Sequence, residues 1–183
     1  AVFLKALSLA ERQEPDDPHV VVLLSNLASI YVQNGKDKQA RNLLQKALNA
    51  AEKPLPPNDA DFLPVLTNLA ALEQRQKKWA AAESYLLRAL QVAEQSLRAN
   101  HPERGVVLEH LGFVHYQQKK FAQAESELRR ALEIQRSSLG IETFRTASIS
   151  VHLAKVLTHQ RLYQEANVLY ANALSLQEKL FGS

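Results

Sequence analysis

Leu24-Ser25-Asn26-Leu27-Ala28 decides the fold, because the stretch returns three times at an interval of 42 residues, from Leu24 to Leu66 and onward. The later copies are Leu66-Thr67-Asn68-Leu69-Ala70, Leu108-Glu109-His110-Leu111-Gly112 and Ser150-Val151-His152-Leu153-Ala154. A second string keeps the same interval at Ala47-Leu48, Ala89-Leu90, Ala131-Leu132 and Ala173-Leu174. A period of roughly 20–50 residues is typical of solenoid and array proteins. The sequence therefore predicts a repeat protein.

Each repeat is predicted to hold two antiparallel helices joined by a short turn. Apolar residues recur at helical spacing from Pro18 to Gln33 and again from about Asp37 to Lys53. Gly35 lies between these segments, and glycine is the residue that most often takes the left-handed conformation at the end of a helix. We expect an all-α single domain over residues 1–183, with about nine helices. Its predicted parts are a leading half-repeat at 1–15 and four complete repeats at about 17–57, 58–99, 100–140 and 141–183.

Small and aromatic residues also recur at fixed positions of the repeat. Ala28, Ala70, Gly112 and Ala154 are small enough to let the two helices of a pair approach closely. Trp79, Phe121 and Tyr163 begin the second helices. Because the aromatic position repeats, we expect these rings to pack between repeats rather than to bind a cofactor.

These residues carry a family resemblance. The pattern L-x-x-L-A, followed by an alanine and then (L/Y)-x-x-A, resembles the tetratricopeptide repeat, whose usual length is about 34 residues. The longer form with L-x-N-L-A, and with Asp17-Pro18 or His101-Pro102 between repeats, is similar to kinesin light chain and its bacterial relatives. The resemblance covers essentially the whole chain and implies a right-handed α–α superhelix that binds proteins or peptides on a concave face lined by the first helices. The sequence departs from the pattern where Asn becomes His110 and His152, and where Leu becomes Ser150.

Composition restricts the possible functions. The chain has no Cys, which excludes disulfides and thiol chemistry, and its net charge of +3 is too small to favour nucleic acid. No apolar run approaches the roughly 18 residues of a membrane span, so we expect no membrane partner and a cytoplasmic location. Phosphate-binding loops and nucleophile elbows are missing, and paired histidines are too far apart to share a metal. We expect no enzyme activity, metal or cofactor, and a chain that is a fragment of a longer protein.

Functional inference is strongest on the face of each first helix that points away from its partner helix. A step of 100° per residue places four residues of each repeat on that face. These sixteen are Val22, Asn26, Ser29, Gln33, Pro64, Asn68, Ala71, Arg75, Val106, His110, Phe113, Gln117, Ser148, His152, Lys155 and His159. If the resemblance holds, the face lines the concave groove.

Two features of this face indicate a peptide. Asn26 and Asn68 match the family's Asn positions, which clamp a peptide backbone, and His110 and His152 can also donate and accept hydrogen bonds; the alternative is a merely hydrated helix face. The sixteen positions include Arg75 and Lys155 but no Asp or Glu, which predicts an acidic peptide with an apolar side chain near Phe113 and Tyr116. The candidate binding residues are Asn26, Ser29, Gln33, Asn68, Arg75, His110, Phe113, Tyr116, Gln117, His152, Lys155 and His159.

Three alternatives remain open. Basic residues gather in the turns inside the repeats, at Lys36, Lys38, Lys77, Lys78, Lys119, Lys120 and Arg161. They complement helix dipoles, or they form a docking ridge for nucleic acid or an acidic protein. Apolar residues near the two ends, at Val2, Phe3, Leu7, Leu9, Leu176, Leu180 and Phe181, suit scaffolding or self-association through the terminal helices. The domain also suits the sensor part of a larger signalling protein.

Overall fold

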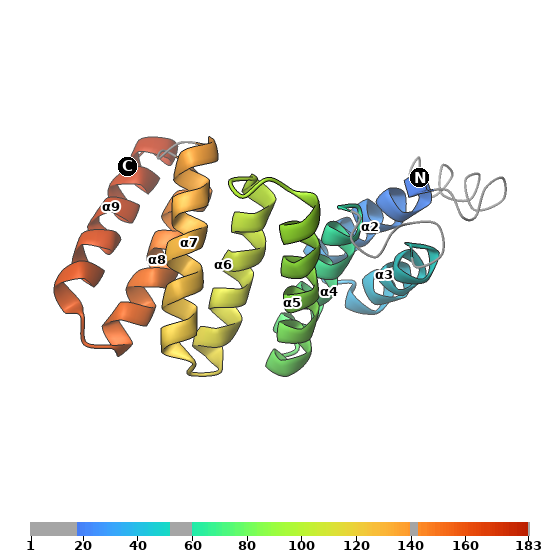
Figure 1. Cartoon of the computed structure of the whole chain (residues 1–183), viewed down its shortest axis with the longest axis horizontal. Helices are drawn as coiled ribbons and strands as arrows, with labels where there is room; N and C mark the ends of the chain where they lie inside the picture. Colours follow the sequence, from blue (N-terminus) through green and yellow to red (C-terminus); the bar gives the residue numbers. More distant parts are fainter. Residues whose placement is uncertain (1–17, 52–59, 140–142, 183) are drawn as a thin grey trace. The chain divides into compact units, whose positions relative to one another are not determined.

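The computed structural model describes residues 18–51, 60–139 and 143–182, and over these residues the chain forms eight α-helices and no strand (Figure 1). Their bounds are α2 Pro18–Gln33, α3 Asp37–Ala51, α4 Phe62–Arg75, α5 Trp79–Ser96, α6 Pro102–Gln117, α7 Phe121–Leu139, α8 Phe144–His159 and α9 Tyr163–Phe181. The predicted all-α fold is confirmed. The leading half-repeat at 1–15, with its apolar residues, and the spacers at 54–58 and 140–141 lie outside the described residues.

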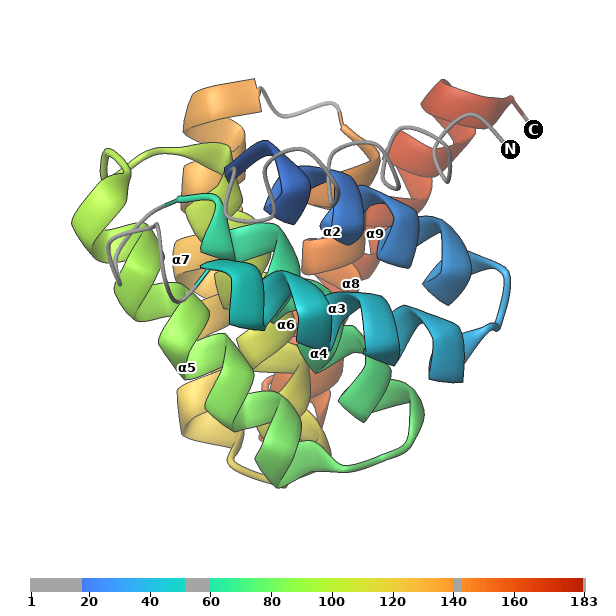
Figure 2. The ribbon, with the colours of Figure 1, turned by 90° about the vertical axis from the view of Figure 1, so that its right-hand side faces the viewer.

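The helices form four pairs, and a three-residue turn joins the two helices of each pair. Figure 2 shows the first pair, in which α2 and α3 lie side by side. The second helices begin at Asp37, Trp79, Phe121 and Tyr163, at the predicted interval of 42 residues. The repeat seen in the sequence is therefore a repeat of helix pairs.

The turn inside each pair has the same backbone geometry in all four copies. Gly35 has a φ of +69°, which confirms the predicted left-handed end of α2. Lys77, Lys119 and Arg161 hold the same position with φ of 57°, 64° and 64°. The next residue then bonds back across the turn, as when the Lys120 N–H donates to the His115 carbonyl at 2.8 Å. Three basic side chains thus occupy a conformation that favours glycine.

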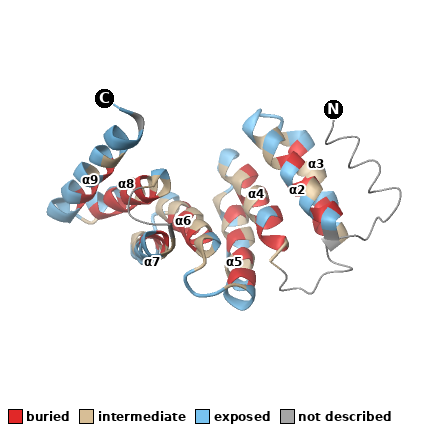
Figure 3. Ribbon diagram, turned by 90° about the horizontal axis from the view of Figure 1, so that it is seen from above, coloured by how far each residue is buried: buried red, intermediate tan, exposed pale blue. Residues whose placement is uncertain are grey.

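The chain divides into two compact parts, which we call the N-terminal unit (residues 1–96) and the C-terminal unit (residues 97–183). In the N-terminal unit α4 packs against both α2 and α3, and in the C-terminal unit α8 packs against α6 and α7. Buried residues lie where the helices of a unit meet, and much of α9 is exposed (Figure 3). A single continuous domain over residues 1–183 stays a prediction.

Small residues set the approach of the paired helices, as the sequence indicates. Ala28, Ala70 and Ala154 are fully buried. Gly112 occupies the same position in α6, where an added Cβ would lie 2.6 Å from Cγ of Leu128. Helices α6 and α7 are thus too close at this point to admit even a methyl group without movement.

Side chains also fix where α6 and α8 begin. His101 caps α6, because its Nδ1 accepts a hydrogen bond from the Glu103 N–H at 3.3 Å. Thr143 caps α8, because its Oγ1 accepts from the Thr146 N–H at 3.1 Å. These caps hold the starts of the two helices that carry the site described next.

Candidate functional site

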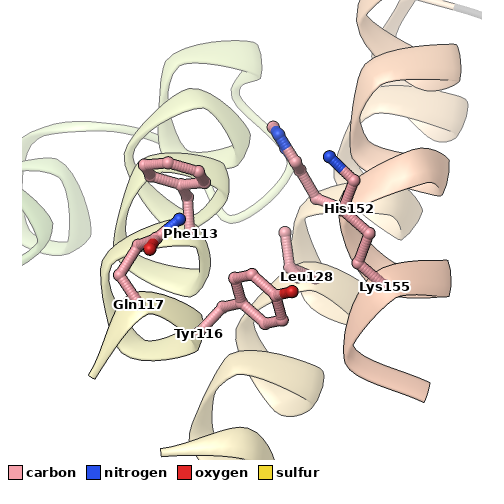
Figure 4. A pocket seen from close by; sticks show the side chains of 6 residues that line it. All are labelled: Phe113, Tyr116, Gln117, Leu128, His152 and Lys155. Carbon is pink, nitrogen blue, oxygen red and sulfur yellow. The ribbon is translucent and has the colours of Figure 1, made fainter. Parts of the chain in front are cut away.

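A pocket of about 400 Å³ opens in the C-terminal unit (Figure 4). Its lining comes from three helices: Phe113, Tyr116 and Gln117 from α6, Leu128 from α7, and His152 and Lys155 from α8. All except Leu128 are candidate binding residues from the sequence. The structure therefore brings five of the predicted residues together around one cavity.

Aromatic rings form one wall of this region. The ring of Phe113 lies 5.4 Å from that of His152, and Tyr116 Oη lies 3.1 Å from Nε2 of His159. Phe121 stacks on His159, with ring centroids 5.0 Å apart and planes 11° apart. The expectation that this aromatic position packs between repeats is confirmed at Phe121. At Tyr163, in the last pair, the equivalent ring is 55% exposed.

A buried carboxylate lies between α6 and α8 beside the pocket. Glu109 is 7% exposed, and its Oε2 accepts from Nη1 of Arg145 at 2.9 Å while its Oε1 accepts from Oγ of Ser148 at 2.9 Å. Nδ1 of His152 lies 3.7 Å from the same Oε1. The sixteen positions of the innermost face contain no acid, and Glu109 lies at the side of this face, next to His152.

The two histidines beside Glu109 favour the neutral form. Burial lowers the pKa of His110; Glu109 opposes this, and the positive charge of Arg145 adds to it. Burial also lowers the pKa of His152, against the opposite effect of Glu109 and with a further lowering by Lys155. Both imidazoles are therefore uncharged at neutral pH.

Lys155 carries the charge that faces the pocket. It is exposed, and among the described residues no carboxylate forms an ion pair with its ammonium group. Gln117, also exposed, adds an amide that can both donate and accept. The pocket thus combines aromatic walls with one positive charge and one flexible hydrogen-bonding group.

In the N-terminal unit two of the predicted residues make contacts within the unit. Asn68 Nδ2 reaches Oγ of Ser25 at 3.4 Å, and Nε of Arg75 lies 3.3 Å from a carboxylate oxygen of Asp37. Arg75 also donates to the Val32 carbonyl at 3.4 Å. On α2, Asn26 and Gln33 are exposed and Ser29 is half-buried. The charge of Arg75 is therefore partly compensated, unlike that of Lys155.

The sixteen positions that the sequence places on the outward face of the first helices are all exposed or half-buried in the structure, as that placement requires. Sequence reasoning missed Leu128 in the pocket and the partners of Glu109. The spacing in the sequence was a signal for the partners of Glu109. Ser148 follows Glu109 by 39 residues, about one helical turn short of the repeat, and Arg145 follows it by 36 residues, about two turns short. Such spacings join neighbouring first helices.

The described residues offer neither a metal-ion site nor a membrane-spanning helix. No three His, Asp or Glu side chains in this part of the chain are grouped so that they could hold a metal ion. None of the described helices combines the length and the apolar character needed to cross a membrane.

Comparison with family models identifies the repeat. Residues 1–53 and 61–137 match a model described as the tetratricopeptide repeat, and residues 146–183 match a second model with the same description. No curated protein matches the chain.

Solved structures show the same fold. BtubC (BKLC) from P. vanneervenii is similar, with 22% identity and a TM-score of 0.80 over 97% of this chain and 70% of that one. A putative kinesin light chain of Podosopora anserina, with nearly identical TPR-like repeats, has 21% identity and a TM-score of 0.73 over 99% and 86%. The pilF protein of Pseudomonas aeruginosa has 26% identity and a TM-score of 0.69 over 92% and 65%.

Proposed function

Because the chain belongs to the tetratricopeptide repeat family, we propose that it binds an extended, acidic peptide on the exposed faces of its first helices and acts by binding alone. Helix pairs of this family serve in general as protein–protein interaction modules. One observation carries the finer proposal: an open pocket with aromatic walls lies beside Lys155, whose charge has no ion-pair partner among the described residues.

The pocket suits one apolar side chain of the peptide. Phe113 and Tyr116 are half-buried, so they present ring surface that a ligand would remove from water. Each Å² of apolar surface removed from water contributes about 25 cal/mol, which favours a Leu- or Phe-sized group. Leu128 is fully buried and forms the apolar floor.

The charge of Lys155 selects a carboxylate near that side chain. An exposed ion pair contributes roughly 0.2–1 kcal/mol and weakens with salt. We assign the amide of Gln117 to the peptide backbone, with which it can exchange hydrogen bonds. Affinity thus comes mainly from the apolar contact, and preference for acidic peptides comes from Lys155.

In the N-terminal unit we assign a similar but weaker role to Asn26, Ser29, Gln33, Asn68 and Arg75. The contact of Asn68 with Ser25 is long, at 3.4 Å, and a peptide backbone can replace it. Arg75 already forms an ion pair with Asp37, and the negative charge of Asp37 weakens its attraction for a peptide carboxylate.

Selection of a random peptide library on the protein tests the proposal. We expect enrichment of peptides with Asp or Glu beside an apolar residue, and loss of their binding in Phe113→Ala and in Lys155→Glu. Lys38→Glu is the matched control, since it makes the same charge change at an exposed lysine of α3 that does not line the pocket. Enriched peptides that bind Lys155→Glu and Phe113→Ala as well as they bind the unchanged protein would contradict the proposal.

A second candidate function is self-association through α9. Helix α9 exposes four large apolar residues: Tyr163 (55%), Val168 (59%), Leu174 (57%) and Leu180 (41%). Leu132, which holds in α7 the position of Leu174, is 6% exposed because α8 and α9 cover it. A first helix from a second copy would cover α9 in the same way. Sedimentation tests this: mass that rises with concentration supports it, and a constant monomer mass contradicts it.

A further inference from the structure

His152 stands between the pocket and the buried carboxylate of Glu109. Its ring lines the pocket with Phe113 and Lys155 (Figure 4). Nδ1 is buried and has no hydrogen-bond partner among the described residues, and the nearest acidic oxygen, Oε1 of Glu109, lies 3.7 Å away. A small shift of the ring would bring these two atoms within hydrogen-bond distance.

Glu109 is positioned to accept that hydrogen bond. Arg145 and Ser148 each donate to one of its oxygens at 2.9 Å, and they hold the carboxylate in place. A carboxylate oxygen accepts more than one hydrogen bond, so Oε1 can serve both Ser148 and His152. Glu109, which already accepts from the nitrogen of Arg145, can therefore also accept from Nδ1–H of His152.

We propose that the pocket binds a peptide carboxylate together with one proton, which His152 takes up from solvent. In the complex, Nε2–H of the imidazolium donates to the peptide carboxylate, and Nδ1–H donates to Glu109. Lys155 pairs with the same peptide carboxylate from the rim. The inference rests on the proposed function and adds a specific recognition group to it.

The charges around His152 explain why peptide binding is coupled to proton uptake. On α6 it faces Glu109 and His110, and on its own helix Arg145 and Lys155 lie nearby, whereas α7 adds the apolar Leu128. In the free protein, burial and Lys155 keep the pKa of His152 below its ordinary value. A carboxylate bound beside Lys155 offsets that positive charge and raises the pKa of His152 in the complex.

The direction of the pH effect follows from these two pKa values. Affinity rises as pH falls through the pKa of His152 in the complex, because each bound peptide then takes up a proton. Affinity stops rising below the pKa of the free protein, which lies under 6.5. Between the two values the dissociation constant changes by up to about tenfold per pH unit.

The experiment uses the acidic peptide of highest affinity from the library selection, with a second version in which its Glu or Asp is replaced by the amide. Dissociation constants are measured between pH 5.5 and 8 at fixed ionic strength. Calorimetry in two buffers of different ionisation enthalpy counts the protons taken up. We expect uptake of up to one proton and tighter binding at lower pH for the acidic peptide, and neither for its amide version.

His152→Asn is the decisive variant, because Asn26 and Asn68 hold the equivalent position in α2 and α4, where a first helix accepts Asn. We expect its affinity to be independent of pH. His19→Asn, in α2, is the matched control and should keep both the affinity and the pH dependence.

The two proposals fail in different ways. If the selected peptide binds with no proton uptake, or if His152→Asn keeps the pH dependence, the role given to His152 is wrong and the proposed function stands. If no acidic peptide is enriched, both proposals fail together.

Discussion

Tyr116 Oη lies 3.1 Å from Nε2 of His159, and this contact joins α6 to α8 across 43 positions of the sequence. The His159 ring also stacks on Phe121 from α7, so three helices of the C-terminal unit meet at one imidazole. The aromatic wall of the pocket is therefore held from three sides.

Tyr116→Phe tests how much the hydrogen bond contributes. A net hydrogen bond is worth about 0.5–1.5 kcal/mol, and both partners lie near the surface, so we expect the free energy of unfolding to fall by about 0.5 kcal/mol. Urea unfolding measures it. His159→Phe, which keeps the stack on Phe121, should have a similar effect, and the double variant should lose little more. If the double variant loses the sum of what the two single variants lose, the side chains do not interact.

Gly112→Ala should destabilise the C-terminal unit although alanine favours helix. Its Cβ would lie 2.6 Å from Cγ of Leu128 and 3.2 Å from the Ala124 carbonyl. Overpacking of this kind costs about 1–3 kcal/mol, which exceeds the gain in helix propensity of about 1 kcal/mol. Urea unfolding measures the change, and Gly112→Ala should cost less in a Leu128→Ala background, because alanine lacks the Cγ that the new methyl group meets. A single variant more stable than the unchanged protein would contradict the close approach of α6 and α7.

Lys119→Gly should stabilise the turn between α6 and α7. Lys119 has a φ of 64°, where a side chain costs about 1–2 kcal/mol, and the entropy lost by glycine offsets about 0.5–1 kcal/mol of this. We expect a net gain of up to about 1 kcal/mol. Gly35→Lys makes the reverse change at the equivalent position and should destabilise the turn after α2. Thermal unfolding measures both variants. If the two substitutions both raise stability or both lower it, the left-handed backbone does not explain their effects.

The stability of the C-terminal unit should fall in mild acid. The pKa values of His110 and His152 are lowered by burial, so the unfolded chain takes up protons first as pH falls below 6.5. The loss grows until the pH reaches the pKa values of the folded protein and is absent above pH 7.5.

Histidine titration by NMR checks the two pKa values directly, and urea unfolding at pH 7.5 and 5.5 checks the stability. His110→Asn/His152→Asn should lose less stability on acidification than the unchanged protein. Imidazole pKa values at or above 6.5 would overturn this prediction.

Much of the fold follows from the sequence because the repeat makes the prediction four times over. The bounds of α2 and the left-handed Gly35 agree with the sequence analysis, since each depends on local signals: a proline, a helical period and a glycine. The same left-handed turn at Lys77, Lys119 and Arg161 has no local signal, because lysine and arginine do not mark such positions. Only the 42-residue interval from Gly35 indicates it.

The site was predictable in direction but not in detail. A step of 100° per residue identified the exposed face and with it Phe113, His152 and Lys155. Side-chain pairs such as His115 with Glu127, 2.7 Å apart and largely buried, depend on rotamers and on the spacing between helices, which the sequence pattern does not specify. For the same reason the Asp37 partner of Arg75 was not foreseen.

The central claim is that the exposed face of α6 and α8 binds an acidic peptide, and NMR mapping of the selected peptide tests it most directly. We expect the amide shifts on titration to gather at Phe113, Tyr116, Gln117, His152 and Lys155, and to shrink as salt is added. Shifts confined to the exposed residues of α9, or to the basic turns around Lys78 and Lys119, would contradict it.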